Sequence, residues 1–482
     1  MNTNFKNKLK YIFNNNYLLF ALLPLVFISN NIGWGGDFSL YINQSIHLIG
    51  GNIDELYASQ VEILKYQKVG PFLYPMGVSI LISPVIYLFG VNFLVLKIYN
   101  LFFWIGSIYF LKRTLENIFT EKKVIITTVY LVLFSFIFIG NVNNIISDIF
   151  FFFFFNLWLY ISTSNRRNTF NSLIISGFIL FLLLIIRPVS YAVFASYLVY
   201  CFYKMILTKK IKYLLPILLP SFLYFVYTNI FNYNFSGNEL EYVFKNIKLS
   251  TPFNNLIYYF ELFFDYLLYP FSLVINKLIS INHKYLFTSI IFLISSFFIL
   301  KKYFITKNFK LLLSNDKLLL VFIVSVAILL LNIITPINNG IRYIFPIIPF
   351  GIYFTFKFFS KKFVIIFVVF QLLNTIFYYT YNYTNILRVN SDVIFSNTNE
   401  SKKVYDYIKN NLKNDTIIFI KPRVLFLYTN IQSVPETNET IKKFKTALVQ
   451  NYISEDELYQ KINKKVIFET ENYKLYKLLN EK

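Results

Sequence analysis

The chain has 482 residues, and its composition excludes an ordinary soluble protein. Hydrophobic residues make up 56% of the sequence and charged residues 15%, whereas an average soluble domain has about 45–50% and about 25%. The mean hydropathy is +0.54. A soluble fold of this composition would leave large apolar patches in water, so the sequence predicts a polytopic membrane protein. Its single cysteine, Cys201, excludes an internal disulfide.

Long apolar runs mark the expected transmembrane helices, because crossing the hydrocarbon core takes about 20 residues of helix. The first run follows Lys6, Lys8 and Lys10 and has no small-residue cleavage site, so it is interpreted as an uncleaved anchor. About eleven spans are expected, near residues 17–32, 92–111, 124–140, 149–163, 170–186, 189–206, 213–231, 285–300, 317–334, 343–359 and 363–380.

The positive charges indicate the orientation of these spans, because Lys and Arg accumulate in cytoplasmic loops. With a cytoplasmic N-terminus, the inner segments carry 21 Lys and Arg residues and three acids, whereas the outer loops carry nine of each. The inner segments are 1–16, 112–123, 164–169, 204–212, 301–317 and 357–362. The net charge of +22 is therefore mostly a topology signal, with some attraction to anionic lipid head groups, and does not indicate nucleic-acid binding.

Two long outer loops interrupt the spans, at about 33–91 and 232–284. The first contains a short apolar helix, Tyr74–Gly90, whose length and internal prolines suit the membrane interface better than a crossing. The second contains Glu261 and Asp265 within an apolar stretch. Because charge inside a membrane is costly, this stretch is also expected to lie along the interface.

The composition becomes polar at about residue 391, which predicts a soluble domain at 391–482 after a membrane domain at 1–390. In the run KKVYDYIKNNL, apolar residues recur at helical spacing, at Val404, Ile408 and Leu412. Four short runs are typical of strands: DTIIFI, RVLFLYT, KVIFET and YKLYKL. The sequence therefore predicts a small α/β domain, which the alternation of spans places outside the cytoplasmic membrane.

Two aspartates stand where helices meet the outer side of the membrane. Asp37 follows a glycine-rich exit in NIGWGGDFSLY, and on a helix that starts there it shares a face with Tyr41 and with Gln44 or Ser45. Asp148 precedes a run of six phenylalanines. Each aspartate is either an N-terminal helix cap or a functional carboxylate. Two carboxylates from different helices would serve one site if the fold brought them together.

Arg187 and Arg342 are basic residues on the side of the membrane where positive charge is disfavoured. An arginine at a water-filled outer cavity is able to hold a phosphate through two hydrogen bonds. The alternative is that each arginine extends its charged end toward lipid head groups. Lys65 and Lys68 lie in an ordinary polar loop and carry a weaker signal.

Five short motifs occur in order along the membrane region, from about residue 17 to residue 380: WGGDFSLY, YPMGVSILISPVIYLFG, NIISDIFFFFFF, IIRPVSY and IRYIFPIIPF. In this order they resemble the GT-C superfamily of integral membrane glycosyltransferases, especially the bacterial lipid A aminoarabinose transferases and the protein O-mannosyltransferases. The resemblance implies a GT-C-like fold, all-α within the membrane, with a small α/β extracytoplasmic domain at the C-terminus.

The resemblance also implies an inverting sugar transfer from a polyprenyl-phosphate donor to an acceptor hydroxyl of a lipid, glycan or protein, at the outer face of the cytoplasmic membrane. It makes Asp37 the general base and requires no cofactor, and one aspartate is a poor ligand set for a divalent metal. The implied site residues are Asp37 and Asp148 for catalysis, Arg187, Arg342 and Lys68 for the donor phosphate, and Tyr41, Tyr74 and Tyr343 for substrate binding.

Two other classes of function stay open. A transporter or flippase would have charges near the bilayer midplane and a repeat of broken helices, and the sequence has neither feature. A non-catalytic scaffold in envelope glycan assembly would bind partners through its outer loops and tail. Walker and dinucleotide-binding glycine motifs are absent from the sequence, so nucleotide-driven transport has no support within it.

Overall fold

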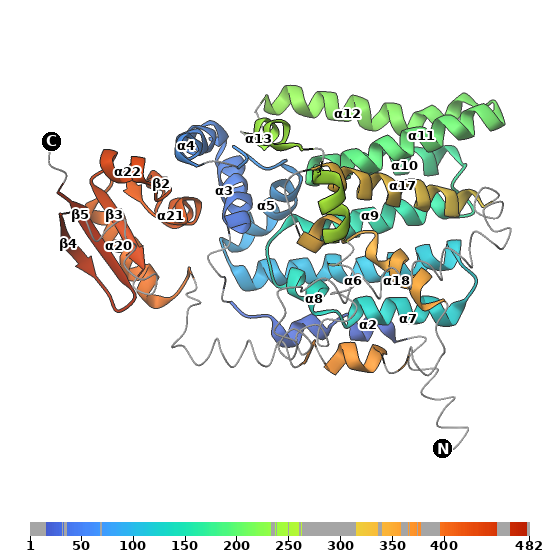
Figure 1. Ribbon diagram of the computed structural model, residues 1–482, viewed down its shortest axis with the longest axis horizontal. Helices are drawn as coiled ribbons and strands as arrows, with labels where there is room; N and C mark the ends of the chain where they lie inside the picture. Colours follow the sequence, from blue (N-terminus) through green and yellow to red (C-terminus); the bar gives the residue numbers. More distant parts are fainter. Residues whose placement is uncertain are drawn as a thin grey trace, which may run out of the picture.

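The computed structural model consists of a bundle of apolar helices with a small sheet-containing domain at one end (Figure 1). The expected span at 285–300 and the expected domain boundary near 390 lie outside the residues that the structure describes. Those residues are 16–30, 32, 36–67, 70–232, 237, 239–248, 250–259, 262, 315–335, 340–357, 365, 367–373, 375–376, 396–450 and 463–479.

The bundle is that of a polytopic membrane protein, as the composition predicts. By length and composition, four of the described helices are able to cross a membrane: α6 (Phe93–Ile118), α11 (Ser190–Thr208), η2 (Ile211–Leu214) continuing into α12 (Leu215–Phe231), and α17 (Asp316–Ile334). Four further apolar segments are shorter: α2 (Tyr17–Phe20) with η1 (Leu23–Phe27), α5 (Gly77–Phe89), α9 (Ser147–Thr163) and α10 (Phe170–Ile186).

Two of the expected spans are interrupted. The segment expected at 17–32 is broken between α2 and η1, where Pro24 stands at the start of the second piece and has no amide hydrogen to continue an α-helical ladder. The segment expected at 124–140 is divided into α7 (Lys122–Leu133) and α8 (Phe136–Val142). The break falls at Ser135, whose backbone is extended.

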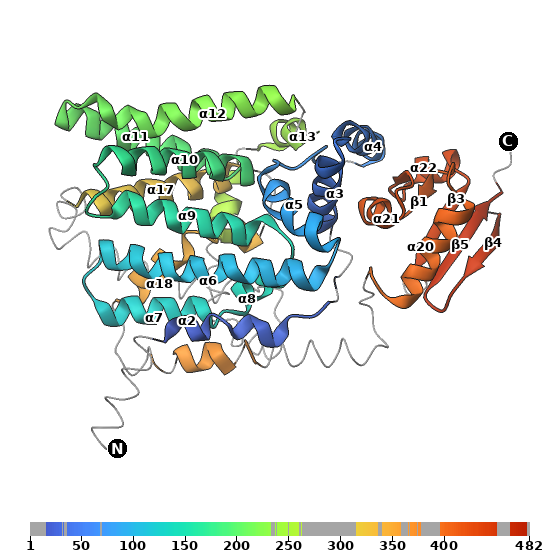
Figure 2. The ribbon, with the colours of Figure 1, turned by 180° about the vertical axis from the view of Figure 1, so that it is seen from behind.

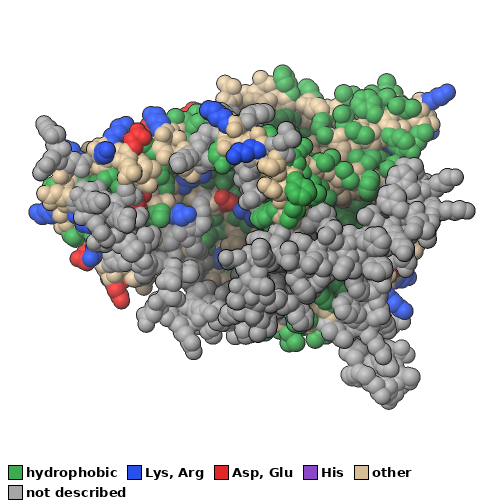
Figure 3. All heavy atoms as spheres, viewed as in Figure 1, with side chains coloured by type: hydrophobic (Ala, Val, Ile, Leu, Met, Phe, Trp, Pro, Cys, Tyr) green, Lys and Arg blue, Asp and Glu red, His purple; other side chains and the backbone are tan. Residues whose placement is uncertain are grey.

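The described surface of the bundle is apolar, as contact with lipid requires. On α12, the side chains of Leu218, Phe222, Phe225 and Ile230 are 61–70% exposed, and apolar side chains gather over this part of the molecule in Figure 3. Inside the bundle, α6 and α9 approach closely, because a Cβ added at Gly106 would lie 2.5 Å from the Phe153 ring.

The two expected outer loops are only partly described. The first contains α3 (Gly36–Gly50), α4 (Ile53–Tyr66) and α5, which confirms both a helix starting beside Asp37 and the short apolar helix. The second contains α13 (Glu239–Asn246). Its acids Glu261 and Asp265 lie outside the described residues.

The C-terminal domain is α/β, as the sequence predicts. Its strands are β1 (Ile417–Ile418), β2 (Ser433–Val434), β3 (Thr446–Gln450), β4 (Lys464–Glu469) and β5 (Tyr473–Leu478), in the order β2-β1-β3-β5-β4. The β1 strand pairs in parallel with β2 and β3, and β5 pairs antiparallel with β3 and β4. The helices are α20 (Asn399–Asn411), α21 (Pro422–Thr429) and α22 (Asn438–Lys443).

The expectation of a strand in RVLFLYT is wrong, because this run forms helix α21. Pro422 occupies its first turn, where a missing amide hydrogen costs nothing, and Asn430 ends it in the left-handed conformation. A short apolar run does not distinguish a strand from a buried helix by its pattern. Val424, Leu425 and Phe426 are all buried, which explains why the run is apolar throughout.

The two faces of the sheet have different partners. On one face, Val404 and Ile408 of α20 pack with Ile417 and Leu448. On the other face, Ile441 of α22 packs with Ile418, Ala447 and Val449, and this cluster includes Tyr66 from α4 of the first outer loop. Figure 2 shows α21 on the side of the domain that faces α3 and α5. The domain therefore joins the bundle through the first outer loop.

The segments expected to be cytoplasmic meet at the end of the bundle away from the C-terminal domain (Figure 1). Asp316, at the start of α17, pairs with Arg167 at 3.4 Å and with Lys204. The next residue, Lys317, donates to the carbonyl of Asn117 at 3.1 Å. Charged side chains at the start of α17 thus join four of the expected inner segments: 112–123, 164–169, 204–212 and 301–317.

Candidate active site

Four charged side chains form a cluster where the bundle faces the C-terminal domain. Arg342, in η3 (Gly340–Tyr343), donates from Nη2 to Oδ2 of Asp37 at 3.0 Å and to Oδ2 of Asp148 at 2.9 Å. Its Nε donates to the same Asp148 oxygen at 3.1 Å. Arg187 pairs with Oδ1 of Asp148. Two carboxylates and two guanidinium groups, from four distant segments, therefore form one connected cluster.

Three of the four charges stand at a helix end that favours them. Asp37 and Asp148 lie in the first turns of α3 and α9, where the helix dipole stabilises negative charge. Arg187 caps the C-terminus of α10, the end that favours positive charge. Pro188 follows it and disfavours helical backbone at Arg187, which is extended, with φ −155° and ψ 138°.

Burial divides the cluster into an inner pair and an outer pair. The side chains of Asp148 and Arg187 are 0% and 6% exposed. Those of Asp37 and Arg342 are 36% and 37% exposed. A ligand is therefore able to reach Asp37 and Arg342 directly, whereas Asp148 and Arg187 are enclosed behind them.

Tyr74 extends the outer pair. Its hydroxyl donates to Oδ1 of Asp37 at 2.9 Å, and its ring stacks on Tyr41 with the centroids 4.7 Å apart. Gln44 holds the Tyr74 backbone, accepting from its amide at 3.1 Å and donating to its carbonyl at 2.7 Å. Burial, with the nearby Asp37 charge, raises the pKa of Tyr74 well above its usual value. The hydroxyl thus stays protonated and remains a hydrogen-bond donor.

Two further predicted site residues are Tyr343 and Lys68. Tyr343 lies under the Arg187 guanidinium, 4.7 Å from its ring centroid, in a cation–π contact. Lys68 falls outside the described residues. Among the residues that are described, no three His, Cys, Asp or Glu side chains gather in a way that would hold a metal ion.

Sequence reasoning missed Arg423, which reaches the site region from the C-terminal domain. Its Nε donates to Oε1 of Gln60 at 2.7 Å, and its Nη2 to the carbonyl of Pro71 at 2.6 Å. The Pro71 carbonyl lies three residues before Tyr74. An arginine in an apolar run of a soluble segment gave no signal of this contact, since only the docking of α21 on the first outer loop creates it.

No family model matches the sequence, and no curated protein matches it. Solved structures do resemble the fold. ArnT from Cupriavidus metallidurans is similar in its apo state (TM-score 0.51, 11% identity, 98% of each chain covered) and bound to undecaprenyl phosphate (TM-score 0.53, 11% identity, 97% of this chain and 98% of that one).

A second similar structure is the archaeal oligosaccharyltransferase AglB from Archaeoglobus fulgidus, in complex with an inhibitory peptide and a dolichol-phosphate. It has a TM-score of 0.52 and 9% identity, and covers 92% of this chain and 70% of that one. At such low identities the likeness concerns the fold. Together with the helical bundle and the C-terminal sheet, it shows that this chain has the GT-C-like fold that the sequence predicts.

Proposed function

We propose that this chain is an inverting glycosyltransferase that moves a sugar from a polyprenyl-phosphate donor to a hydroxyl of a lipid, glycan or protein acceptor. The observation that carries the proposal is the sharing of Arg342 between Asp37 and Asp148 where the bundle faces the C-terminal domain. The fold supports it, since one similar structure holds undecaprenyl phosphate and another holds a dolichol-phosphate.

Asp37 is assigned as the general base. Its carboxylate would take the proton of the acceptor hydroxyl as that oxygen forms a bond to the anomeric carbon. The bond between the anomeric carbon and the phosphate oxygen breaks at the same time, and its electron pair leaves with the polyprenyl phosphate. The hydrogen bond from Tyr74 supports this role, because it holds one oxygen of Asp37 in place and leaves the side chain partly exposed.

Arg342 is assigned to the phosphate that departs. Negative charge grows on this group in the transition state, and a preorganised guanidinium stabilises it. Arg342 is the more exposed of the two arginines in the cluster. Arg187 is assigned to holding Asp148, which in turn orients Arg342 and, through Arg342, the sugar. In this arrangement Arg187 acts on the phosphate through its neighbours.

The tyrosines are assigned to the substrate and its surroundings. Tyr74 lies beside Asp37 and would contact the acceptor or the sugar. Tyr41, which is 4% exposed, supports the Tyr74 ring from behind. Tyr343 keeps the Arg187 side chain in its orientation through the cation–π contact. Lys68, from the same outer loop as Tyr74, is retained as a further phosphate ligand.

We place the site at the outer face of the cytoplasmic membrane, with a cytoplasmic N-terminus and an extracytoplasmic C-terminal domain. The asymmetry of the positive charges supports this orientation. A fusion of a reporter enzyme after residue 390 tests this orientation. We expect a reporter that works only outside the cytoplasm to be active in this fusion. Cytoplasmic activity of that fusion would reverse the sidedness of the whole site.

The reaction is tested with purified protein and a panel of polyprenyl-phosphate sugars, comparing wild type with Asp37→Asn. The loss of a general base is expected to slow transfer by about 10²–10⁴-fold. Asp54→Asn is the control, because Asp54 is an exposed acid of the same outer loop. Equal turnover by wild type and Asp37→Asn would remove this mechanism. Absence of turnover with every donor would favour a flippase or a scaffold.

Arg342→Lys separates the role of the arginine from that of its charge. Lysine keeps the positive charge but has no planar fork with which to hold two carboxylates and a phosphate together. We expect the variant to lose most of its transfer activity, with a higher KM for the donor. A variant with unchanged kinetics would show that Arg342 does not contact the phosphate.

A further inference from the structure

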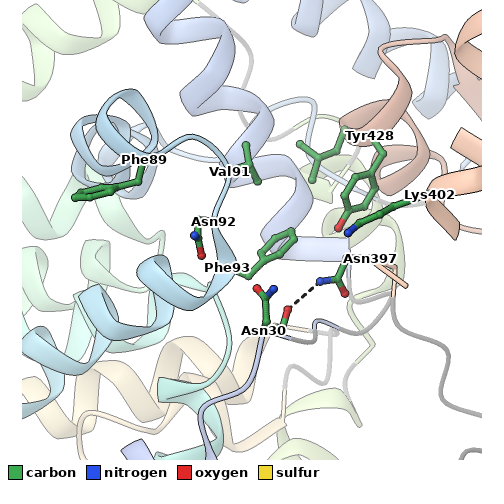
Figure 4. Close-up of a pocket in the computed structure, with 9 residues that line it drawn as sticks. Asn30, Phe89, Val91, Asn92, Phe93, Asn397, Lys402 and Tyr428 are labelled. Atoms are coloured by element: carbon green, nitrogen blue, oxygen red, sulfur yellow. Dashed lines mark hydrogen bonds between the residues drawn. The ribbon is translucent and has the colours of Figure 1, made fainter. Parts of the chain in front are cut away.

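A cavity of about 440 Å³ lies between the membrane bundle and the C-terminal domain, apart from the charge cluster. The residues that line it come from the segment after η1, the junction of α5 and α6, the start of α20 with the residues just before it, and α21: Asn30, Phe89, Val91, Asn92, Phe93, Asn397, Lys402, Leu427 and Tyr428. Figure 4 shows Asn30, Phe93, Asn397, Lys402 and Tyr428 near one another, with Phe89 farther away and pointing outward. The volume of the cavity falls within the range of about 300–1,000 Å³ that small-molecule sites occupy.

The lining favours a negatively charged, hydroxylated ligand. Lys402 is the one charged side chain among the described lining residues, and it makes no hydrogen bond or ion pair with any described residue. Figure 4 shows it extending toward the hollow beside Tyr428. The asparagines add amide groups. The Oδ1 of Asn92 caps α6, and the Nδ2 of Asn397 donates to the Asn30 carbonyl at 2.9 Å. The Asn92 Nδ2 and the Asn30 side-chain amide, which make no hydrogen bond with the described residues, are left for the hydroxyl groups of a ligand. An ammonium with amides around it suits a phosphate ester of a polyol.

One side of the cavity continues onto an exposed apolar surface. Tyr87, Leu88 and Phe89, at the end of α5, are 74%, 70% and 61% exposed. Phe89 and the next lining residue, Val91, connect this surface to the cavity. Three consecutive exposed apolar side chains at the end of a membrane bundle are suited to contact with acyl chains. A ligand that used both surfaces would have a polar head and an apolar tail.

The cavity shares a wall with the segment that carries Asp37. The Phe93 ring lies 6.0 Å from that of Phe38 and 6.5 Å from that of Tyr428. The Tyr428 hydroxyl is hydrogen-bonded to Ser396 at 3.1 Å. A ligand here would be held one layer of side chains away from α3, between the two parts of the molecule.

We propose that this cavity binds the head group of an anionic phospholipid, with the phosphate at Lys402, the head-group hydroxyls at the asparagines and the acyl chains along the exposed end of α5. The proposal goes beyond the transfer reaction and does not depend on it. The binding test below uses no sugar donor, so the failure of one proposal leaves the other standing.

The test uses the full-length protein in neutral detergent and measures lipid adducts by native mass spectrometry. Phosphatidylglycerol is the probe. Phosphatidylcholine, with the same acyl chains, and glycerol 1-phosphate, without chains, are the comparisons. A lysine beside an anionic lipid contributes about 1 kcal/mol, so phosphatidylglycerol is expected to bind at least about fivefold more tightly than phosphatidylcholine.

Two variants locate the binding. Lys402→Glu is expected to abolish the preference for phosphatidylglycerol. Lys403→Glu makes the same charge change on the neighbouring exposed position of α20, which does not line the cavity, and is expected to keep it. Val91→Trp fills the cavity without changing charge and is expected to weaken binding. Equal binding of the two lipids, or equal effects of the two lysine variants, would overturn the proposal. Equally tight binding of glycerol 1-phosphate would overturn the role of the acyl chains.

Discussion

Arg342 Nη2 lies 2.9 Å from Asp148 Oδ2, although 194 residues separate the two in the sequence. The contact joins the first turn of α9 to the short helix η3 near the end of the membrane region. Because the side chain of Asp148 is fully buried, its charge has to be balanced by groups inside the protein. The two arginines supply that balance, and several consequences are measurable.

Removing one partner of the inner pair should destabilise the protein more than removing both. Arg187→Met leaves a buried carboxylate with one arginine, and Asp148→Leu leaves a buried guanidinium without its counterion. Each is expected to cost about 3–5 kcal/mol, the usual cost of breaking a buried pair. Thermal unfolding in detergent, followed by circular dichroism, should show that the double variant loses less stability than either single variant. Strictly additive losses would mean that the pair is not coupled.

Tyr74→Phe should reduce transfer without unfolding the protein. It removes the hydroxyl that donates to Asp37 but keeps the ring that stacks on Tyr41. A hydrogen bond to a charged group contributes about 1.5–3 kcal/mol, so kcat is expected to fall by about tenfold to a hundredfold. The matched control is Tyr41→Phe, since the Tyr41 hydroxyl is bonded to Ser147 and not to Asp37. An equal effect of both variants would contradict a special role for Tyr74.

Arg423 and Gln60 should be energetically coupled across the junction between the C-terminal domain and the outer loop. Their hydrogen bond is 2.7 Å long, and Gln60 is fully buried. In a double-mutant cycle of Arg423→Ala and Gln60→Ala, the coupling energy is expected to be about 1–3 kcal/mol. Unfolding in detergent measures it.

The same Arg423→Ala variant should also lower kcat. Arg423 donates a hydrogen bond to the carbonyl of Pro71, which lies three residues before Tyr74 in the sequence, and so helps to position Tyr74 beside Asp37. Lys421→Ala, an exposed position immediately before α21, is the control and should change neither quantity. A normal kcat in Arg423→Ala would show that this contact only stabilises the junction.

Glu121 should make stability depend on pH at the other end of the bundle. Burial raises its pKa, but hydrogen bonds from Lys357 and Tyr353 outweigh this and lower the pKa to about 2 from an ordinary value of 4.5. A carboxylate with a lowered pKa stabilises the fold above its unfolded pKa, and this contribution is lost as the pH falls from about 4.5 toward about 2. The difference in Tm between wild type and Glu121→Gln should therefore shrink over this range. A constant difference would exclude the ion pair as its source.

Much of the membrane fold was accessible from sequence because lipid imposes a strong local requirement. Helix α10 begins and ends where its apolar run does, at Phe170 and Ile186, since a helix in lipid must satisfy its own backbone. Breaks of a helix within an apolar run were harder to predict from the sequence. The break at Ser135 separates two apolar segments that hydropathy alone reads as one.

The soluble domain shows where local pattern fails. The runs KVIFET and YKLYKL form β4 and β5 as predicted. The similar run RVLFLYT forms α21, because it is buried against both the sheet and α3 and so has no polar face to reveal its period. The sequence pattern did not predict strands β2 and β3. Strand β2 is only two residues long, which is too short to show an alternating pattern.

By itself, the sequence determined the class of molecule, its apolar helices, and which ionisable residues needed an explanation, because apolar burial and the cost of charge in a membrane act on each segment separately. Only the tertiary structure decided that Asp37, Asp148, Arg187 and Arg342 meet, that the inner pair is closed and the outer pair open, and that Arg423 reaches the first outer loop. These are relations between segments far apart in the chain, and they exist only once the helices have packed.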